Sequence, residues 1–340
     1  MATWRVRSLW VAVAVGGALV GVLACGVGGC AARRPGQQGD LDADGDAPDA
    51  EPWLARRSRD TALITHGPTP AADGPLVLQP GMERVHYRSH SAGIELSLLA
   101  IVATPRRTPE TAGTLADRQP AVLLLHSGLA LTSEHLAWAA PFVDAGMVVM
   151  LPAWRGENGN PGDFELLAGE VDDAKAAGRF LATQPDVDID HLYLFGHAEG
   201  GALAALLALD PDVPFQRIAA SSGVTTAATF VRWQREDPRT VPFDAASLVE
   251  LRRRALLPNA GELVQPLLLY VGDDDALGAR YARRAAERAP ALVEVVSVAG
   301  DGATSVEEAL RRFLALVVKD AGAAPVAATS RPAGASRSAP

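Results

Sequence analysis

A short strand that leads through a glycine-rich turn into a helix is the part of this sequence best suited to chemistry. The apolar run Leu192–Phe195 is followed by GHAEGG at residues 196–201 and then by an Ala/Leu-rich segment. This context is typical of a nucleophile elbow, whose strained central residue presents a nucleophile above a sheet. The central residue here is Ala198, which has no oxygen or sulfur, so we expect that no acyl-enzyme can form at this position.

Alternating β-rich and helical patterns between residues 82 and 320 must position this turn. They predict an α/β domain with a mostly parallel central sheet and helices on both faces. Strands are expected at 84–89, 95–104, 121–126, 147–152, 192–196, 217–221, 266–272 and 292–298, the first two as an antiparallel pair. Apolar residues at three- and four-residue spacing predict a helix at 165–183.

A long gap without a strand, residues 224–263, predicts a small helical cap. It contains Trp233 and the run Arg252-Arg253-Arg254. Three successive arginines favour a solvated helix face over a binding patch.

Several motifs, in this order, resemble the α/β-hydrolase superfamily, most closely its prolyl-oligopeptidase-like and dienelactone-hydrolase-like domains. The resemblance rests on LLHSG at 124–128, PAWRGENGNPG at 152–162, EVDDA at 170–174 and the turn at 196–201. It covers about residues 82–320 and implies the α/β-hydrolase fold. In active relatives it also implies a serine, an acid and a histidine in that chain order.

This chain departs from that pattern at two of the three positions. The resemblance places Ala198 at the serine, Asp275 at the acid and Ala303 at the histidine, and no histidine follows His197. Loss of one member of such a triad costs several powers of ten in rate, and the acid cannot replace the others. We therefore expect triad hydrolysis to be absent.

The resemblance also implies an oxyanion region at Ser127, Gly128 and Leu129, together with the backbone N–H of Glu199. Without a nucleophile, such donors would bind carbonyls or anions only weakly. The carboxylate of Glu199 would disfavour anions if it pointed inward, whereas an outward orientation would leave the site neutral to them. The sequence leaves both orientations open.

Other serines and histidines offer an alternative, an active ester or peptide hydrolase with a relocated site. Ser127, Ser221 and Ser222 stand at predicted strand ends, and His126 and His197 flank the turn region. In the family that the chain resembles, these two histidine positions are more often structural. The serines also have no obvious base, because no late histidine exists.

Composition excludes several other functions. The chain of 340 residues is 48% hydrophobic with a net charge of −9, so it can form a large core but is poorly suited to nucleic acid. Its two cysteines, Cys25 and Cys30, both lie near the N-terminus, which excludes a disulfide framework in the body of the chain. We expect no cofactor and no metal site.

The two ends are expected to lie outside the fold. Residues 1–24 resemble a bacterial lipoprotein signal, with Cys25 as the lipidated residue and Cys30 as the alternative. An acidic Pro/Gly-rich linker is predicted at 25–81 and a disordered tail at 321–340. The sequence thus predicts an exported, lipid-anchored pseudoenzyme of the cell envelope, held at the membrane by its N-terminal lipid and binding a small ligand or an envelope protein.

Overall fold

The computed structural model describes residues 51–57, 63, 76–91, 93–105, 118–238 and 240–322. All of them belong to a compact unit at 38–340, and a second unit, 1–37, lies outside the described residues. The predicted signal, Cys25, Cys30 and most of the predicted tail are therefore also outside them. Among the described residues, no helix combines the length and the apolarity needed to span a membrane.

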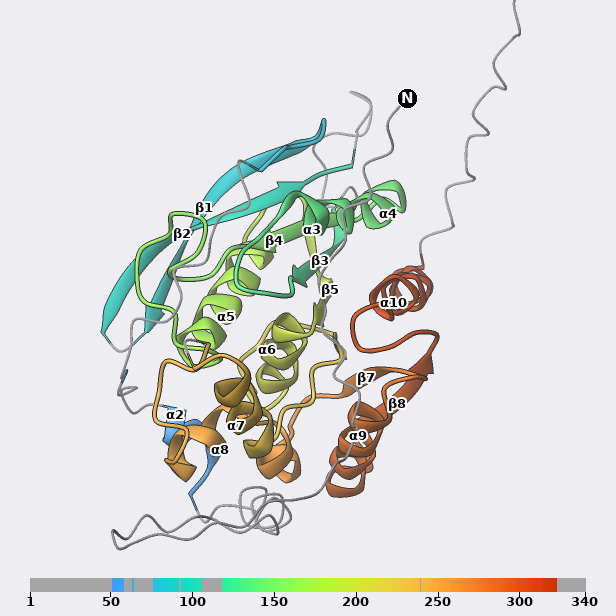
Figure 1. The fold of residues 1–340 in the computed structure, drawn as a ribbon. Helices are drawn as coiled ribbons and strands as arrows, with labels where there is room; N and C mark the ends of the chain where they lie inside the picture. Colours follow the sequence, from blue (N-terminus) through green and yellow to red (C-terminus); the bar gives the residue numbers. More distant parts are fainter. Residues whose placement is uncertain are drawn as a thin grey trace, which may run out of the picture. The chain divides into compact units, whose positions relative to one another are not determined.

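An eight-stranded sheet forms the centre of the described part (Figure 1). Its order is β1-β2-β4-β3-β5-β6-β7-β8, with β1, β2 and β4 paired antiparallel and the remaining pairs parallel. The strands are β1 Met82–Ser91, β2 Ile94–Ala103, β3 Gln119–Leu125, β4 Val148–Pro152, β5 Val187–His197, β6 Arg217–Ser221, β7 Leu267–Gly272 and β8 Val293–Val298. The predicted α/β-hydrolase architecture, including its antiparallel first pair, is confirmed.

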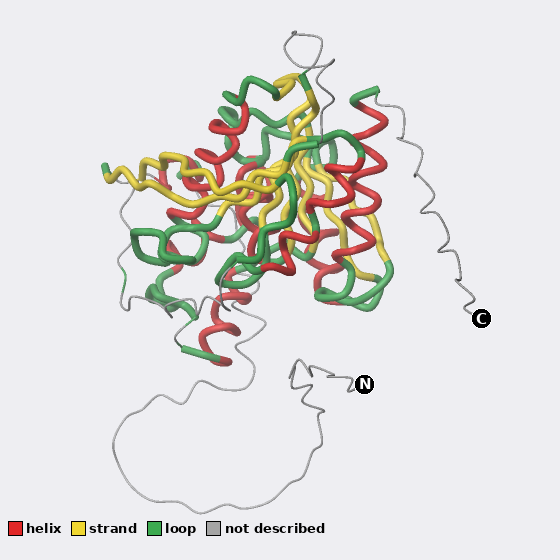
Figure 2. Tube along the Cα trace, turned by 90° about the horizontal axis from the view of Figure 1, so that it is seen from above, coloured by secondary structure: helices red, strands yellow, loops and turns green. Residues whose placement is uncertain are grey.

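Helices cover both faces of the sheet (Figure 2). One face packs against α3 (Ser133–Ala137), α4 (Ala139–Asp144) and α10 (Val306–Asp320). The other packs against α5 (Gly169–Ala182), α6 (Glu199–Leu207) and α9 (Ala276–Arg288).

Central strands are buried on both faces, and β3 shows why its sequence is continuously apolar. Val122 and Leu124 belong to the cluster beneath α3, α4 and α10, whereas Leu123 and Leu125 belong to the cluster beneath α5 and α6. All four side chains are fully buried. A strand enclosed in this way needs apolar side chains at every position rather than at alternate ones.

The predicted cap region forms α7 (Ala227–Glu236), α8 (Leu248–Arg254) and a short 3-10 helix, η3 (Leu257–Glu262). The expectation of a solvated arginine run is wrong, because Arg253 and Arg254 are buried. The guanidinium of Arg254 lies 3.9 Å from the ring centre of Phe243, and its Nε donates to the carbonyl of Leu166 at 2.8 Å. Burial lowers the pKa of Arg254 to about 10, so the group stays charged near neutral pH.

Part of the predicted linker is a docked helix, α2 (Trp53–Arg57). Trp53 is buried, and its indole Nε1 donates to the carbonyl of Arg253 at 2.9 Å. Arg56 is also buried and donates to Asn259 in η3, while Arg57 pairs with Asp172 in α5. The linker prediction is therefore wrong for residues 51–57, because buried contacts hold this helix against the cap.

Replacement of Trp53 by alanine is expected to lower the free energy of unfolding by about 3–5 kcal/mol, as for other buried large aromatic residues. The loss combines the buried ring with its hydrogen bond to α8. The matched control is Leu54→Ala, since Leu54 is 45% exposed on the same helix and its loss should change stability by less than about 0.5 kcal/mol. Urea denaturation measures both, and a loss of less than about 0.5 kcal/mol in the Trp53 variant would show that α2 contributes no docking energy.

Candidate active site

The turn between β5 and α6 has the strained geometry of a nucleophile elbow. Ala198 has φ 49° and ψ −111°, a region that residues with a side chain rarely occupy. Its N–H donates to the carbonyl of Ser221 in β6 at 2.9 Å, and its carbonyl accepts from Ala202 at 2.8 Å. The neighbouring strand and the first turn of α6 therefore hold position 198 in this conformation.

Glycines around Ala198 allow the backbone segments to approach one another. A Cβ at Gly200 would overlap the carbonyls of Leu125 and His126 at the end of β3. A Cβ at Gly201 would lie only 2.6 Å from the carbonyl oxygen of Ser221. The turn is thus packed against both adjacent strands, which leaves space for a side chain at position 198 but not at either glycine.

The side chain of Glu199 points inward, which answers the question that the sequence leaves open. Its Oε2 accepts a hydrogen bond from the backbone N–H of Gly128 at 2.7 Å. Gly128 belongs to the predicted oxyanion region, so a carboxylate of the protein itself occupies one of the expected oxyanion donors. A second anion at this donor would be repelled by the charge of Glu199.

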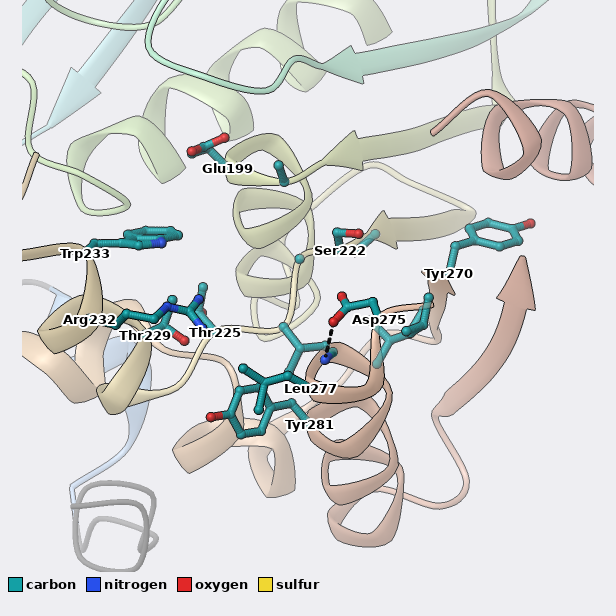
Figure 3. Close-up of a pocket in the computed structure, with 17 residues that line it drawn as sticks. Glu199, Ser222, Thr225, Thr229, Arg232, Trp233, Tyr270, Asp275, Leu277 and Tyr281 are labelled. Carbon is teal, nitrogen blue, oxygen red and sulfur yellow. Dashed lines mark hydrogen bonds between the residues drawn. The ribbon is translucent and has the colours of Figure 1, made fainter. Parts of the chain in front are cut away.

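Asp275 lies in the same crevice as Ala198 and Glu199 (Figure 3). This crevice has a volume of about 170 Å³, and Ser222, Arg232 and Trp233 also line it. The Oδ1 of Asp275 accepts from the N–H of Gly278 at 2.8 Å and thereby caps the N-terminus of α9. The acid predicted from the sequence therefore lies close to the elbow, and its carboxylate already accepts a hydrogen bond from the first turn of α9.

Ala303, the predicted histidine position, is exposed in the turn that precedes α10. It is not among the residues that line the crevice, and its N–H donates to Asp301 at 2.9 Å. The preceding residue, Gly302, does not line the crevice either, but it lies near two residues that do. A Cβ built on Gly302 would lie 3.5 Å from Asp275 Oδ2 and 3.7 Å from Ser222 Oγ. The assignment of Ala303 stays a prediction, with position 302 as its nearest alternative.

A serine and a histidine lie within hydrogen-bond distance beside the oxyanion region, but the histidine is the donor, which is the opposite of what a catalytic base requires. Ser127 Oγ lies 3.2 Å from Nε2 of His135. Burial lowers the pKa of His135 to about 3, so its ring is neutral near pH 7. The backbone N–H of Thr132 donates to Nδ1 at 3.0 Å, which places the ring proton on Nε2. His135 thus donates to Ser127 and cannot accept its proton in this arrangement.

The two serines at the end of β6 differ in their access to the crevice. Ser221 is fully buried, with its Oγ 3.2 Å from Nδ1 of His197. Ser222 lines the crevice and has a φ of 52°. Its Oγ is shielded from solvent and has no hydrogen-bond partner among the residues that the structure describes.

His126 is buried and directly precedes the oxyanion region at Ser127. Its ring stacks on Trp154, and its Nε2 lies 3.2 Å from Glu157 Oε2. Burial has the largest single effect and lowers the pKa of His126, but the charge and the hydrogen bond of Glu157, with smaller contributions from Ser127 and Glu199, together raise this pKa above its ordinary value. Burial also raises the pKa of Glu157. Both groups are fully shielded from the solvent, which supports the structural interpretation of this histidine.

Residues from α7 complete the site, and sequence reasoning did not identify them. Beside the crevice lies a second pocket of about 240 Å³, which we call the acidic subpocket. It is lined by Leu129, Leu166, Glu199, Trp233, Glu236, Asp237 and Thr240. Glu199 and Trp233 are common to both pockets. In the described part of the chain, no group of three or more His, Cys, Asp or Glu residues is arranged to hold a metal ion.

Comparison with known proteins agrees with this geometry. Residues 134–277 match the prolyl oligopeptidase family. The chain is 33% identical over 92 residues to the uncharacterized peptidase YtmA of Bacillus subtilis, which covers 27% of this chain and 31% of that one. It is 28% identical over 222 residues to the uncharacterized protein Rv2307c of Mycobacterium tuberculosis, which covers 61% of this chain and 72% of that one.

Solved structures with the same fold include Pyrococcus horikoshii acylaminoacyl peptidase, with a TM-score of 0.53, 17% identity and coverage of 71% of this chain and 41% of that one. A puromycin-hydrolyzing peptidase of Mycobacterium tuberculosis gives a TM-score of 0.58, 19% identity and coverage of 72% and 41%. This chain therefore spans less than half of those peptidases. It has the α/β-hydrolase fold, and its residues 134–277 are similar to the prolyl oligopeptidase family.

Buried neutral histidines in this region should make the protein sensitive to acid. Burial lowers the pKa of His197 to about 4, from an ordinary value of 6.5. As the pH falls below 6.5, the unfolded chain binds a proton that the folded state does not bind until about pH 4, so stability falls across that window. Replacement of His197 by Gln should reduce the stability lost between about pH 7.5 and pH 4.5 by about 2–3 kcal/mol.

Urea denaturation at both pH values measures this difference, and His86→Gln is the control. His86 is exposed on β1, so its replacement should leave the pH dependence unchanged. An identical loss of stability between the two pH values in the His197 variant and the parent protein would show that His197 does not cause the acid sensitivity.

Proposed function

We propose that this protein is a pseudoenzyme that binds a ligand in the crevice and does not hydrolyse it. One observation carries the proposal: the elbow presents Ala198, and the carboxylate of Glu199 accepts from Gly128 in the oxyanion region. Hydrolysis by a serine triad needs a nucleophile and vacant oxyanion donors. The nucleophile is absent at this turn, and one of the expected donors, the N–H of Gly128, is already occupied.

Retention of a shaped crevice favours binding over a purely structural role. Ala198, Asp275 and the side chains from α7 enclose a pocket, in which Ser222 offers a hydroxyl without a partner among the described residues. Among the relatives of known structure, a puromycin hydrolase with a serine-to-alanine substitution has been solved in complex with PGG, at 21% identity and a TM-score of 0.55. That structure shows, for a protein of the same fold, a complex with a ligand after a serine has been replaced by alanine.

We further propose that the protein is exported and anchored in the cell envelope by a lipid on Cys25. Support comes from the N-terminal sequence alone, in which an apolar run ends at Val22-Leu23-Ala24-Cys25. Cys30 remains the alternative site. A partner protein in the envelope is a second possible ligand for the crevice.

The pseudoenzyme proposal predicts that the purified protein neither reacts with a fluorophosphonate probe nor hydrolyses short acyl esters. Two triple variants restore the missing serine and histidine and test whether this turn is the site of the lost reaction. The first carries Ala198→Ser, Ala303→His and Glu199→Ala. The second carries Ala198→Ser, Gly302→His and Glu199→Ala. Glu199→Ala removes the carboxylate from Gly128, so we expect more labelling from these variants than from the corresponding variants that retain Glu199.

Labelling of the unmodified protein would contradict the proposal and favour the relocated hydrolase. Loss of that labelling in Ser127→Ala or Ser222→Ala would then identify the nucleophile. Ala198→Ser alone serves as the control for folding and for the need for a base.

Lipid attachment is tested by metabolic labelling with radioactive palmitate. We expect label in the full-length protein, no label after Cys25→Ala, and unchanged label after Cys30→Ala. Loss of label only in the Cys30 variant would move the site to that residue, and no label in the parent protein would contradict lipidation.

A further inference from the structure

One edge of the sheet has no strand beside it in the described part of the chain. This edge belongs to β1, the outermost strand, which pairs with β2 on its other side (Figure 1). An antiparallel ladder engages the backbone N–H and C=O groups of alternate residues, so those of the other residues in β1 point outward. β1 is ten residues long, and proteins usually cover an edge of that length, because it would otherwise pair with another chain.

Basic side chains occupy every second position of β1. Four exposed residues share this face: Arg84, His86, Arg88 and His90. Tyr87 and Ser89, which alternate with them, are buried on the side of α5. Glu95 of β2 lies 2.7 Å from His90 and 3.8 Å from Arg88. Four basic side chains thus have one carboxylate partner among the described residues, which leaves capacity for further negative charge.

The acidic stretch that precedes α2 has the same period of two. Its aspartates occupy alternate positions: Asp40, Asp42, Asp44 and Asp46. Between them stand Leu41, Ala43 and Gly45, which are apolar or small. In an extended segment, the four carboxylates would lie on one face and the small residues on the other. The spacing of these negative charges therefore equals the spacing of the basic residues on β1.

A groove beside β1 can receive the face with the small residues. It has a volume of about 640 Å³ and lies between β1 and α5, where Ala176 and Phe180 line it. Phe180 packs against Tyr87 of β1, with ring centres 6.4 Å apart. Lys175 and Arg179 also line the groove, so its charge does not oppose an acidic segment.

The docked helix α2 brings the acidic stretch to this edge. Arg57 of α2 pairs with Asp172, whose carboxylate also accepts from Ser91 Oγ, at the end of β1, at 2.8 Å. Asp46 precedes the start of α2 at Trp53 by seven residues, which span up to about 25 Å. The stretch can therefore lie along β1, and it would run parallel to β1 because both segments lead toward the same end of the strand.

We infer that residues 40–46 add to the free edge of β1 as a ninth strand. Their carboxylates lie beside Arg84 and Arg88, and Leu41 and Ala43 face the groove. Backbone hydrogen bonds supply the pairing, and the alternation of charge selects which face turns outward. The added strand protects the edge from pairing with a second copy of the chain. This docking does not depend on whether the crevice binds a ligand.

Hydrogen–deuterium exchange of the full-length protein, measured by mass spectrometry, tests the inference. We expect the amides of residues 41–47 to exchange at least about tenfold more slowly than in an unfolded peptide. Replacement of all four aspartates by asparagine should remove this protection. Arg88→Gln should reduce it by about threefold, whereas Arg311→Gln, on a side chain of α10 that is 67% exposed, is the control and should leave it unchanged.

A variant of unchanged composition separates strand addition from general attraction between charges. It carries Leu41→Asp, Asp42→Leu, Asp44→Gly and Gly45→Asp, so the net charge stays the same and the alternation is lost. We expect this variant to lose protection as fully as the asparagine variant. The amides of β3 are the internal reference for folding and should exchange equally slowly in every variant.

Rapid exchange of residues 41–47 in the parent protein, or full protection in the rearranged variant, would overturn the inference. Protection of β1 that increases with protein concentration would place a second copy of the chain on this edge, and this result would also overturn it.

Discussion

Close backbone packing at the turn between β5 and α6 is the constraint on which the site depends. Gly200 lies against the end of β3 and Gly201 against the end of β6, so the turn can occupy only one position above the sheet. That position forces Ala198 into a strained conformation, which the hydrogen bonds to Ser221 and Ala202 maintain. The same packing directs Glu199 toward Gly128. The arrangement that would expose a nucleophile thus places a carboxylate in the oxyanion region.

A buried ion network connects this rigid centre to the outer strands. The guanidinium of Arg155, in the loop after β4, donates two hydrogen bonds to Asp173 of α5, at 2.9 and 2.7 Å, and the backbone N–H of Arg155 donates a third at 3.1 Å. Asp173 also accepts from Ser89 of β1 at 2.6 Å. Removal of one partner would leave a buried charge uncompensated, which costs far more than an exposed ion pair contributes. The loop at 152–162 is therefore held by specific pairing.

The sequence predicts the sheet well because its strands are enclosed on both faces and therefore read as continuous apolar runs. It also predicts the elbow, since the glycines and the strand–turn–helix pattern are local signals. It does not predict the direction of Glu199, because a rotamer depends on neighbours such as Gly128 that are distant in the chain. The docked helix α2 was missed for a similar reason: one turn has no periodicity, and Trp53 acquires its partner only when α8 is present.

The walls of the crevice come from two different parts of the fold. The floor belongs to the core of the sheet, whereas Arg232 and Trp233 come from α7 in the cap. Arg254 attaches the cap to the loop before α5 through the carbonyl of Leu166, a residue that also lines the acidic subpocket and has a positive φ of 52°. Because Trp53 bonds the carbonyl of Arg253, α2 stabilises the segment that carries Arg254. The contacts that dock α2 therefore also support the wall against which a ligand would lie.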